Sequence, residues 1–242
     1  MGTQPYYAAI RCKNIGERMT ITINPAESVL VLDLDDTLYA EFDYKLSGIK
    51  KVCSLLARLY PEYSEEILLS QIDPDSSDWL NKLASFCNLN AAEKNSLLWV
   101  YRLHNPEIQP YVCANELKAL LNRFCGSAII SDGRSLSQRL KLHGLGLLHH
   151  FEHILISEAW HSEKPNPERF DFIMEQYPGK TYIYVGDNIK KDFITPKQMG
   201  WLTIGLKPSE KNIHRYPPES FSDNHQPHYW IRHINQIKEF IC

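Results

Sequence analysis

The sequence has few cysteines, little net charge and no long apolar run. Its six cysteines are scattered without a C-x-x-C pair, which argues against a disulfide framework or a zinc site and favours reduced thiols. A formal net charge of -3 supplies no basic surface for nucleic acid or an acidic membrane. No segment has the apolar length of a membrane span, and the first residues lack the apolar run of a secretion signal. These absences predict a cytoplasmic protein with neither a nucleic-acid nor a membrane partner.

The apolar residues that are present gather in short runs. The 242 residues, 43% of them hydrophobic, suffice for one α/β domain that carries an insertion. Short unalternating runs suit strands buried on both faces, and they lie at 29–32, 128–130, 154–156, 182–185 and 201–204. Helical signals between the later runs indicate βαβ units. The sequence therefore predicts a doubly wound, Rossmann-like parallel sheet.

One long segment interrupts this alternation. Residues 43–114 show no strand signal and predict an inserted α-helical cap domain, with helices at 45–59, 64–70, 77–86 and 91–103. The α/β core is then discontinuous, made of 29–42 and 115–242, behind an N-terminal extension of residues 1–28. Residues 230–241 predict a closing helix. In the insertion, Trp79 and Trp99 are expected in the core, and Lys45, Lys50 and Lys51 on a solvated face that could instead meet an anionic substrate.

The first predicted strand ends in a cluster of carboxylates. Asp33-Leu34-Asp35-Asp36-Thr37 follows it, and side chains at positions i and i+2 share one face if the strand geometry persists. Two adjacent carboxylates repel, and a divalent cation with a preference for oxygen ligands, such as Mg²⁺, relieves the repulsion. On this segment alone, ordinary turn and helix-cap residues remain an alternative. A calcium loop does not fit, because Leu38 and Tyr44 stand where glycine and glutamate are needed.

Polar residues also follow three later strands or precede their helices. Ser131-Asp132-Gly133 offers a hydroxyl and backbone N–H groups suited to phosphate oxygens. Lys164 precedes a predicted helix, where a cation opposes the helix dipole and a specific role is favoured. Gly186-Asp187-Asn188 and Asp192 add two more carboxylates. Each group has an ordinary turn or cap explanation, but ligands bind beyond the carboxyl ends of parallel strands, so together these residues predict one site.

In this order and spacing, the four motifs resemble those of the haloacid dehalogenase-like (HAD) superfamily, in its phosphatase branch with a helical cap between the first and second motifs. The resemblance covers about residues 29–206. It implies that Asp33 is a nucleophile that forms an aspartyl-phosphate, and that Asp35 is the general acid and base. It implies Mg²⁺ as the cofactor, held by Asp33, the Asp35 backbone carbonyl and Asp187. The phosphate would be bound by Ser131, Asp132 and Lys164, with support from a second layer formed by Thr37, Asn188 and Asp192.

The resemblance implies a magnesium-dependent phosphatase that acts on a small phosphate ester, either a sugar phosphate or a nucleoside monophosphate. Dehalogenases and phosphonatases of this superfamily lack an acid at the position of Asp35, so its presence favours phosphate esters. Two alternatives stay open at this point. One is a phosphomutase of the same fold, and the other is a non-catalytic binding module, for which loss of a nucleophile or metal ligand would be the expected sign.

Overall fold

A parallel sheet forms the centre of the protein. The computed structural model describes residues 10–15, 18–213 and 216–241. All neighbouring strands of the six-stranded sheet run parallel, in the order β5-β4-β3-β6-β7-β8. The strands are β3 (Ser28–Leu32), β4 (Gly126–Ser131), β5 (His153–Ile156), β6 (Thr181–Gly186), β7 (Leu202–Leu206) and β8 (Tyr229–Ile231). The predicted apolar runs form all of these strands except β8, and the predicted α/β fold class is confirmed.

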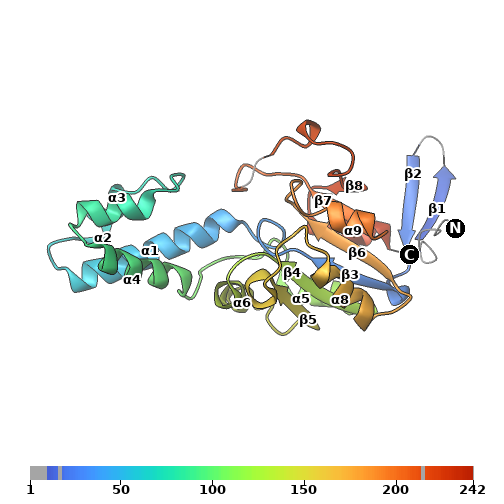
Figure 1. The fold of residues 1–242 in the computed structure, drawn as a ribbon, viewed down its shortest axis with the longest axis horizontal. Coiled ribbons are helices and arrows are strands. Elements are labelled where there is room, and N and C mark those ends of the chain that lie inside the picture. Colours follow the sequence, from blue (N-terminus) through green and yellow to red (C-terminus); the bar gives the residue numbers. More distant parts are fainter. Residues whose placement is uncertain (1–9, 16–17, 214–215, 242) are drawn as a thin grey trace.

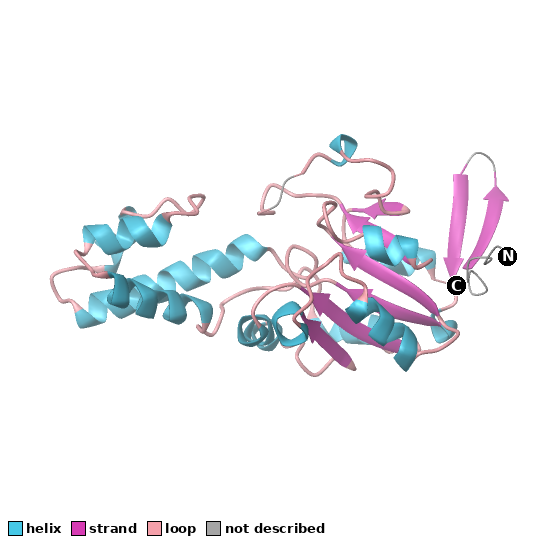
Figure 2. Ribbon diagram, in the orientation of Figure 1, coloured by secondary structure: helices cyan, strands magenta, loops and turns pink. Residues whose placement is uncertain are grey.

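Helices cover both faces of this sheet (Figure 2). Because side chains alternate along a strand, Leu30 and Leu32 pack into one core with residues of α5, α6 and η3, whereas Val29 and Val31 pack into a second core with residues of α8. The helices of this part are α5 (Ala114–Leu121), α6 (Ser135–Gly144), α7 (Ser157–Trp160), α8 (Glu168–Gln176), α9 (Ile194–Gln198) and the 3-10 helices η1 (Pro25–Glu27), η2 (Pro218–Ser220) and η3 (Ile234–Phe240). The sheet is therefore wound on two sides.

The order of the strands reverses at β3. The chain proceeds outward from β3 to β4 and β5, and then returns to the other side of β3 to form β6, β7 and β8. The carboxyl ends of β3, β4 and β6 consequently lie side by side where the two halves of the sheet diverge. In open α/β sheets this point is where ligands bind.

A group of helices lies at one end of the molecule (Figure 1). It comprises α1 (Glu41–Leu59), α2 (Glu65–Ser70), α3 (Trp79–Phe86) and α4 (Ala91–Arg102), close to the four predicted helices. They have a hydrophobic core of their own, which includes Val52, Leu56 and Leu83. The chain enters and leaves this part at neighbouring points, since Tyr39 forms a bridge with Pro110.

Helix α1 begins earlier than predicted, and the reason lies in the acidic cluster. Asp36 Oδ1 accepts a hydrogen bond of 2.8 Å from the backbone N–H of Glu41, which is the first residue of the helix. This bond satisfies one of the free donors at the helix N-terminus. Asp36 Oδ2 accepts another from the backbone N–H of Ile213, at 3.0 Å. Asp36 thus connects the loop after β7 to the N-terminus of α1 through hydrogen bonds.

The two ends of the chain differ from the expectation. The predicted N-terminal extension contains an antiparallel hairpin of β1 (Ile10–Ile15) and β2 (Arg18–Ile23), while its residues 1–9 and 16–17 lie outside the described chain. The closing helix predicted over residues 230–241 is wrong in its first residues and in its type. Tyr229–Ile231 pairs with β7 as a parallel strand, in keeping with the β preference of Tyr, Trp and Ile, and the helix that follows is a 3-10 helix.

Two further expectations concern the insertion and the membrane. Trp79 is buried as predicted, but Trp99 is 47% exposed, so its placement in the core is wrong. Among the described residues, no helix combines the length and the apolar character needed to cross a bilayer.

Candidate active site

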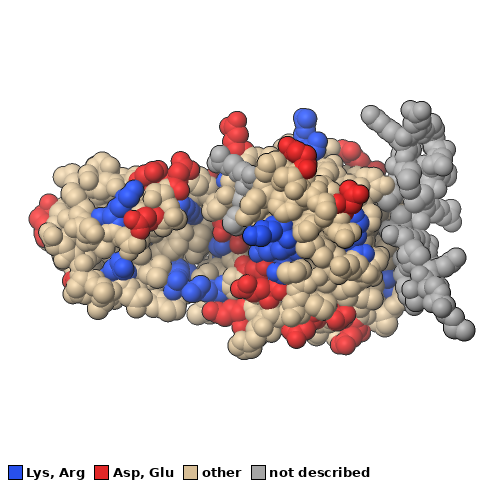
Figure 3. Space-filling model, turned by 45° about the horizontal axis from the view of Figure 1, so that its top comes forward, with Lys and Arg blue, Asp and Glu red and all other residues tan. Residues whose placement is uncertain are grey.

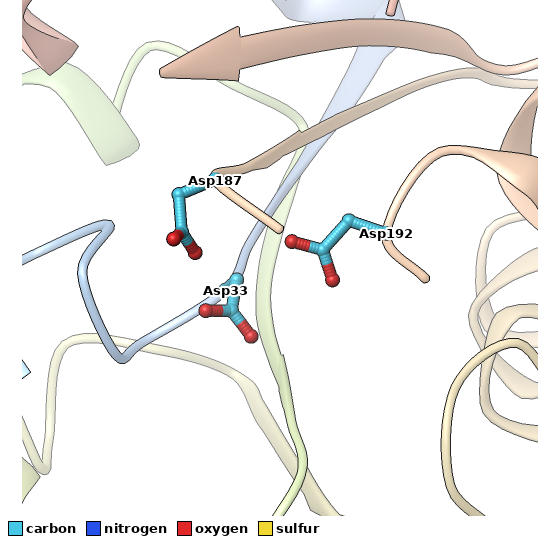
Figure 4. Close-up of side chains that lie close together, drawn as sticks. All are labelled: Asp33, Asp187 and Asp192. Atoms are coloured by element: carbon cyan, nitrogen blue, oxygen red, sulfur yellow. The ribbon is translucent and has the colours of Figure 1, made fainter. Parts of the chain in front are cut away.

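Three carboxylates meet at the point where the sheet diverges. Asp33 directly follows β3, Asp187 directly follows β6, and Asp192 lies in the segment between β6 and α9. Figure 4 shows the three side chains pointing toward one another. One oxygen from each lies within 4.8 Å of the others, and all three residues are buried. The acidic motifs that the sequence places far apart therefore share one small volume.

Lys164 supplies positive charge to this cluster. Its ammonium lies 2.6 Å from Asp33 Oδ1 and 2.7 Å from Asp192 Oδ1, and it donates to the hydroxyl of Tyr184 at 2.9 Å. The side chain of Lys164 is only 1% exposed. Burial acts to lower the pKa of Lys164, but the charges of Asp192 and Asp33 raise it well above its ordinary value. Lys164 therefore carries its charge in the centre of the site.

One lysine does not balance three buried carboxylates. Burial raises the pKa of Asp33 to about 7, with Lys164 opposing the shift and Asp192 adding to it. Burial, and then the charges of Asp192 and Asp33, raise the pKa of Asp187 well above its ordinary value. Such a set of crowded hard oxygen donors fits Mg²⁺, which would relieve the repulsion.

The carboxylate of Asp35 lies outside this cluster and faces α6. Its Oδ1 accepts hydrogen bonds from the Tyr39 hydroxyl at 2.5 Å and from Lys141 Nζ at 2.7 Å, and its Oδ2 accepts one from Gln138 Nε2 at 2.7 Å. Burial acts to raise the pKa of Asp35, but the charge and hydrogen bond of Lys141 outweigh it and the pKa is lowered. Both oxygens are thus held, and in the absence of a bound phosphate the ionised form is favoured.

These partners of Asp35 were not predicted from the sequence. The available signal was the spacing of Gln138 and Lys141, which are three residues apart and share a face of the helix that follows Ser131. That spacing does not by itself say which acidic group they meet.

Ser131 and Asp132 close another side of the site. The Ser131 hydroxyl is buried and accepts a hydrogen bond of 2.7 Å from Gln138 Nε2. The Asp132 carboxylate forms ion pairs with Arg169 at 2.5 Å and with Lys191 at 2.8 Å. Burial acts to raise the pKa of Asp132, yet the surrounding cations lower it to about 2. Both oxygens of its carboxylate are therefore engaged by cations.

The remaining predicted residues lie behind the carboxylates. The backbone N–H of Asn188 donates to Asp192 Oδ2 at 2.9 Å. Thr37 is fully buried, and its hydroxyl has no hydrogen-bond partner among the described residues. Asn212, in the loop after β7, donates to Asp187 Oδ2 at 3.3 Å. This loop lies beyond the segment that carried the family resemblance, and no motif pointed to it.

Gly186 leaves the space that Asp192 needs. A Cβ atom at this position would lie 2.4 Å from Asp192 Oδ2, well inside van der Waals contact. The glycine that precedes Asp187 thus allows the end of β6 to approach the second carboxylate of the same motif.

Two small cavities open onto these groups. One, of about 130 Å³, is lined by the carboxylate cluster, Ser131 and Lys164. The other, of about 230 Å³, lies between α1, α4 and α6. They share Asp35, Glu41 and Asp132 in their walls, so a single small molecule could occupy both.

The protein has a Rossmann-like sheet, and Asp33 and Lys164 form an ion pair beside further carboxylates at the point where the two halves of the sheet diverge. This combination is typical of a hydrolase of the HAD-like class. The sequence model of the haloacid dehalogenase-like hydrolases matches residues 30–206. The chain belongs to this family.

Similarity to individual proteins points the same way. The chain is 30% identical over 131 residues to the pyrimidine 5'-nucleotidase YjjG of Escherichia coli, covering 51% of this chain and 54% of that protein. It therefore spans about half the length of this relative. It is 27% identical over 195 residues to the glyceraldehyde 3-phosphate phosphatase of Methanocaldococcus jannaschii, covering 73% and 83% of the two chains. The magnesium-bound structure of YfnB from Bacillus subtilis has the same fold, with a TM-score of 0.61, 20% identity and coverage of 88% and 98%.

Proposed function

We propose that this protein is a magnesium-dependent phosphatase that hydrolyses a small phosphorylated metabolite, a sugar phosphate or a nucleoside monophosphate. The observation that carries the proposal is the pairing of Lys164 with Asp33, whose atoms lie 2.6 Å apart inside a cluster of carboxylates. An anionic nucleophile approaches a phosphate only where cations offset their repulsion. The two relatives named above, a pyrimidine 5'-nucleotidase and a glyceraldehyde 3-phosphate phosphatase, support the same reaction class.

In the first step, a carboxylate oxygen of Asp33 attacks phosphorus in line with the ester bond. The bond between phosphorus and the alcohol oxygen breaks, and its electron pair leaves with that oxygen. Ser131, the backbone N–H of Asp132 and Lys164 hold the phosphoryl oxygens. Water then attacks phosphorus, which releases inorganic phosphate and restores the carboxylate of Asp33.

Asp35 moves the proton in both steps. The protonated carboxyl gives its proton to the departing alcohol oxygen, and the carboxylate so formed takes a proton from the attacking water, which restores the protonated form. The negative charge of a bound phosphate favours that protonated form, against the charge of Lys141. Lys141 and Gln138 hold its two oxygens, which supports this role because a general acid must be positioned against its target. A halide leaves without a proton, so the presence of Asp35 favours a phosphate ester over a haloacid.

Mg²⁺ would be held by Asp33, the backbone carbonyl of Asp35 and Asp187. When bound, Mg²⁺ offsets the negative charge shared by the nucleophile and the phosphate. Behind these ligands we assign supporting roles to three residues, Thr37, Asn188 and Asp192.

The helical insertion acts as a cap over the site. We assign it to residues 43–114, and the core to 29–42 and 115–242 behind the extension of residues 1–28. The adjoining cavities, of about 130 and 230 Å³, support a substrate of small-molecule size, because pockets for small molecules span about 300–1,000 Å³.

Release of inorganic phosphate from a panel of sugar phosphates and nucleoside monophosphates, with Mg²⁺ or with EDTA, tests this function. Wild type should turn over at least one ester only with Mg²⁺, and Asp33→Asn should abolish the reaction. Asp171→Asn, an exposed aspartate of α8, is the matched control and should retain activity. Absence of phosphate release by a folded, Mg²⁺-binding wild type would overturn the proposal and direct the test to phosphoryl transfer between isomers.

A further inference from the structure

The cavity of about 230 Å³ between α1, α4 and α6 is lined by several positively charged side chains. Its wall includes four basic side chains, which are Lys45, Arg102, Arg134 and Lys141. It lies beside the cavity of the carboxylate cluster, where the phosphoryl group would bind. The alcohol portion of a substrate would therefore lie among these cations. Figure 3 shows basic side chains on both sides of the junction between the helical part and the sheet part.

The carboxylates in the same wall do not neutralise all of these cations. Asp35 pairs with Lys141, and Asp132 pairs with Arg169 and Lys191, neither of which lines this cavity. The third carboxylate of the wall is Glu41, and burial raises its pKa to about 8, which favours its neutral form. Lys45 donates to the backbone carbonyl of Ser76 at 3.1 Å.

Two arginines remain without a carboxylate partner. Among the described residues, neither Arg102 nor Arg134 has a carboxylate oxygen within 4 Å. Partial burial, and then the positive charge of Arg134, lower the pKa of Arg102, so the two guanidinium groups act on each other. Glu158 acts on Arg102 more weakly, and its carboxylate accepts a hydrogen bond from the backbone N–H of Ser135.

These two arginines come from different parts of the chain and line the same cavity. Arg102 is the last residue of α4 in the insertion, and Arg134 immediately precedes α6 in the core. A hydrogen bond of 2.9 Å from the Ser137 hydroxyl to the backbone carbonyl of Arg102 ties the two helix ends together. Two like charges that line one cavity create a position where an anion lowers the free energy of both.

We propose that the substrate carries a second anionic group, a carboxylate or a second phosphate, on its alcohol portion, and that Arg102 and Arg134 bind this group. This inference rests on the proposed phosphatase function and narrows its substrate class. Among small phosphate esters it favours phosphorylated hydroxy acids, phosphorylated sugar acids and sugar bisphosphates over neutral sugars and nucleosides.

Matched pairs of esters that differ only in the second anion test the proposal. Suitable pairs are phosphoglycolate against hydroxyethyl phosphate, phosphogluconate against glucitol phosphate, and a hexose bisphosphate against the hexose monophosphate with the same scissile ester. We expect kcat/KM to be about tenfold higher for the anionic member of at least one pair, since a charge-assisted contact contributes that much. The first two pairs report a carboxylate and the third a phosphate, so the panel separates the two sources.

The ratio of kcat/KM within a pair is then measured for Arg102→Gln and Arg134→Gln. Each change should reduce the ratio about tenfold. Because the ratio compares two substrates on the same enzyme, partial unfolding of a variant cancels. Arg139→Gln is the matched control, since this arginine is exposed on α6 and does not line the cavity, and it should keep the wild-type ratio. Raising the ionic strength should also lower the wild-type ratio, because salt screens the contact.

The possible failures are distinguishable. If wild type releases no phosphate from any ester, the proposed function itself is wrong. If wild type hydrolyses the neutral and anionic members equally, the phosphatase function stands and the anion site is overturned. The same conclusion follows if the kcat/KM ratio within a pair is unchanged in both arginine variants.

Discussion

Lys141 and Asp35 form an ion pair in which the Lys141 ammonium lies 2.7 Å from Asp35 Oδ1. The lysine comes from α6, and the aspartate comes from the loop after β3. The Lys141 side chain is only 6% exposed, so solvent screens the pair little. This contact connects the proposed proton-transfer group to a helix that the family motifs do not include.

We expect Lys141→Met to lower kcat about tenfold to a hundredfold, because Asp35 loses both a positioning contact and the charge that holds it. KM should change much less than kcat, since Lys141 holds Asp35 and does not hold the phosphate. Lys141→Arg should restore a large part of kcat. An equal loss of kcat in Lys118→Met, an exposed lysine of α5, or an unchanged kcat in Lys141→Met would contradict this role.

Strands β3 to β7 were predictable because they are largely buried and therefore appear as unbroken apolar runs. The carboxylates, Ser131 and Lys164 were predictable because they stand at the ends of those strands or before helices. Lys141 was not, because its spacing from Gln138 identifies a shared helix face but not the carboxylate opposite. Asn212 was not predictable either, because its loop has no periodic pattern and reaches Asp187 only through the tertiary fold.

Removing Mg²⁺ should expose the repulsion among the carboxylates. The pKa of Asp187 is raised in the folded state, so its ionised form destabilises the fold at any pH above its ordinary pKa. In EDTA at neutral pH, Asp187→Asn should therefore raise the Tm by a few degrees, given that about 1 kcal/mol shifts the Tm of a chain of this size by 2–4 °C.

Adding Mg²⁺ should raise the Tm of wild type, because the ion binds only the folded state. It should raise the Tm of Asp187→Asn much less. Differential scanning fluorimetry with a Mg²⁺ titration measures both effects, with Asp171→Asn as the control. A wild-type Tm that ignores Mg²⁺ would contradict the metal assignment.

Gly186→Ala should damage catalysis more than stability. The added methyl group would collide with Asp192, which must move away from Lys164 and from the backbone N–H of Asn188. A displacement of this kind can lower kcat about a hundredfold. Gly179→Ala provides the contrast, because its Cβ would meet nothing within 4 Å while its φ of +75° strains the backbone. Gly179→Ala should lose stability and keep its kcat. The explanation would be refuted if Gly186→Ala kept its kcat while Gly179→Ala lost it.

His104 should make the stability of the protein depend on pH. Its ring is buried and contacts the Tyr101 carbonyl at 2.6 Å and the Ser47 hydroxyl at 3.1 Å. Burial lowers the pKa of His104 below its ordinary value of 6.5, although the Tyr101 carbonyl opposes the shift. The neutral ring is thus favoured in the folded state, so its contribution is complete above pH 6.5 and declines as the pH falls below that value.

Urea unfolding at pH 7.5 and pH 5.5 measures this effect. The wild-type midpoint should fall between the two conditions, and His104→Gln should show a smaller fall from a lower starting value. The exposed His149→Gln should match wild type. An identical pH dependence in wild type and His104→Gln would show that other groups cause it.

The bridge between Tyr39 and Pro110, with the hydrogen bond of 2.8 Å from the backbone N–H of Tyr111 to the carbonyl of Leu38, has a consequence for how such enzymes diversify. Because the chain leaves the sheet part and returns to it at adjacent positions, the whole helical segment is joined to the sheet part by two neighbouring connecting segments. An insertion of different length or sequence can be exchanged there while the carboxylates at the ends of β3 and β6 keep their places. Exchange of the helical insertion can thus change the substrate preference while the residues that carry out the reaction stay the same.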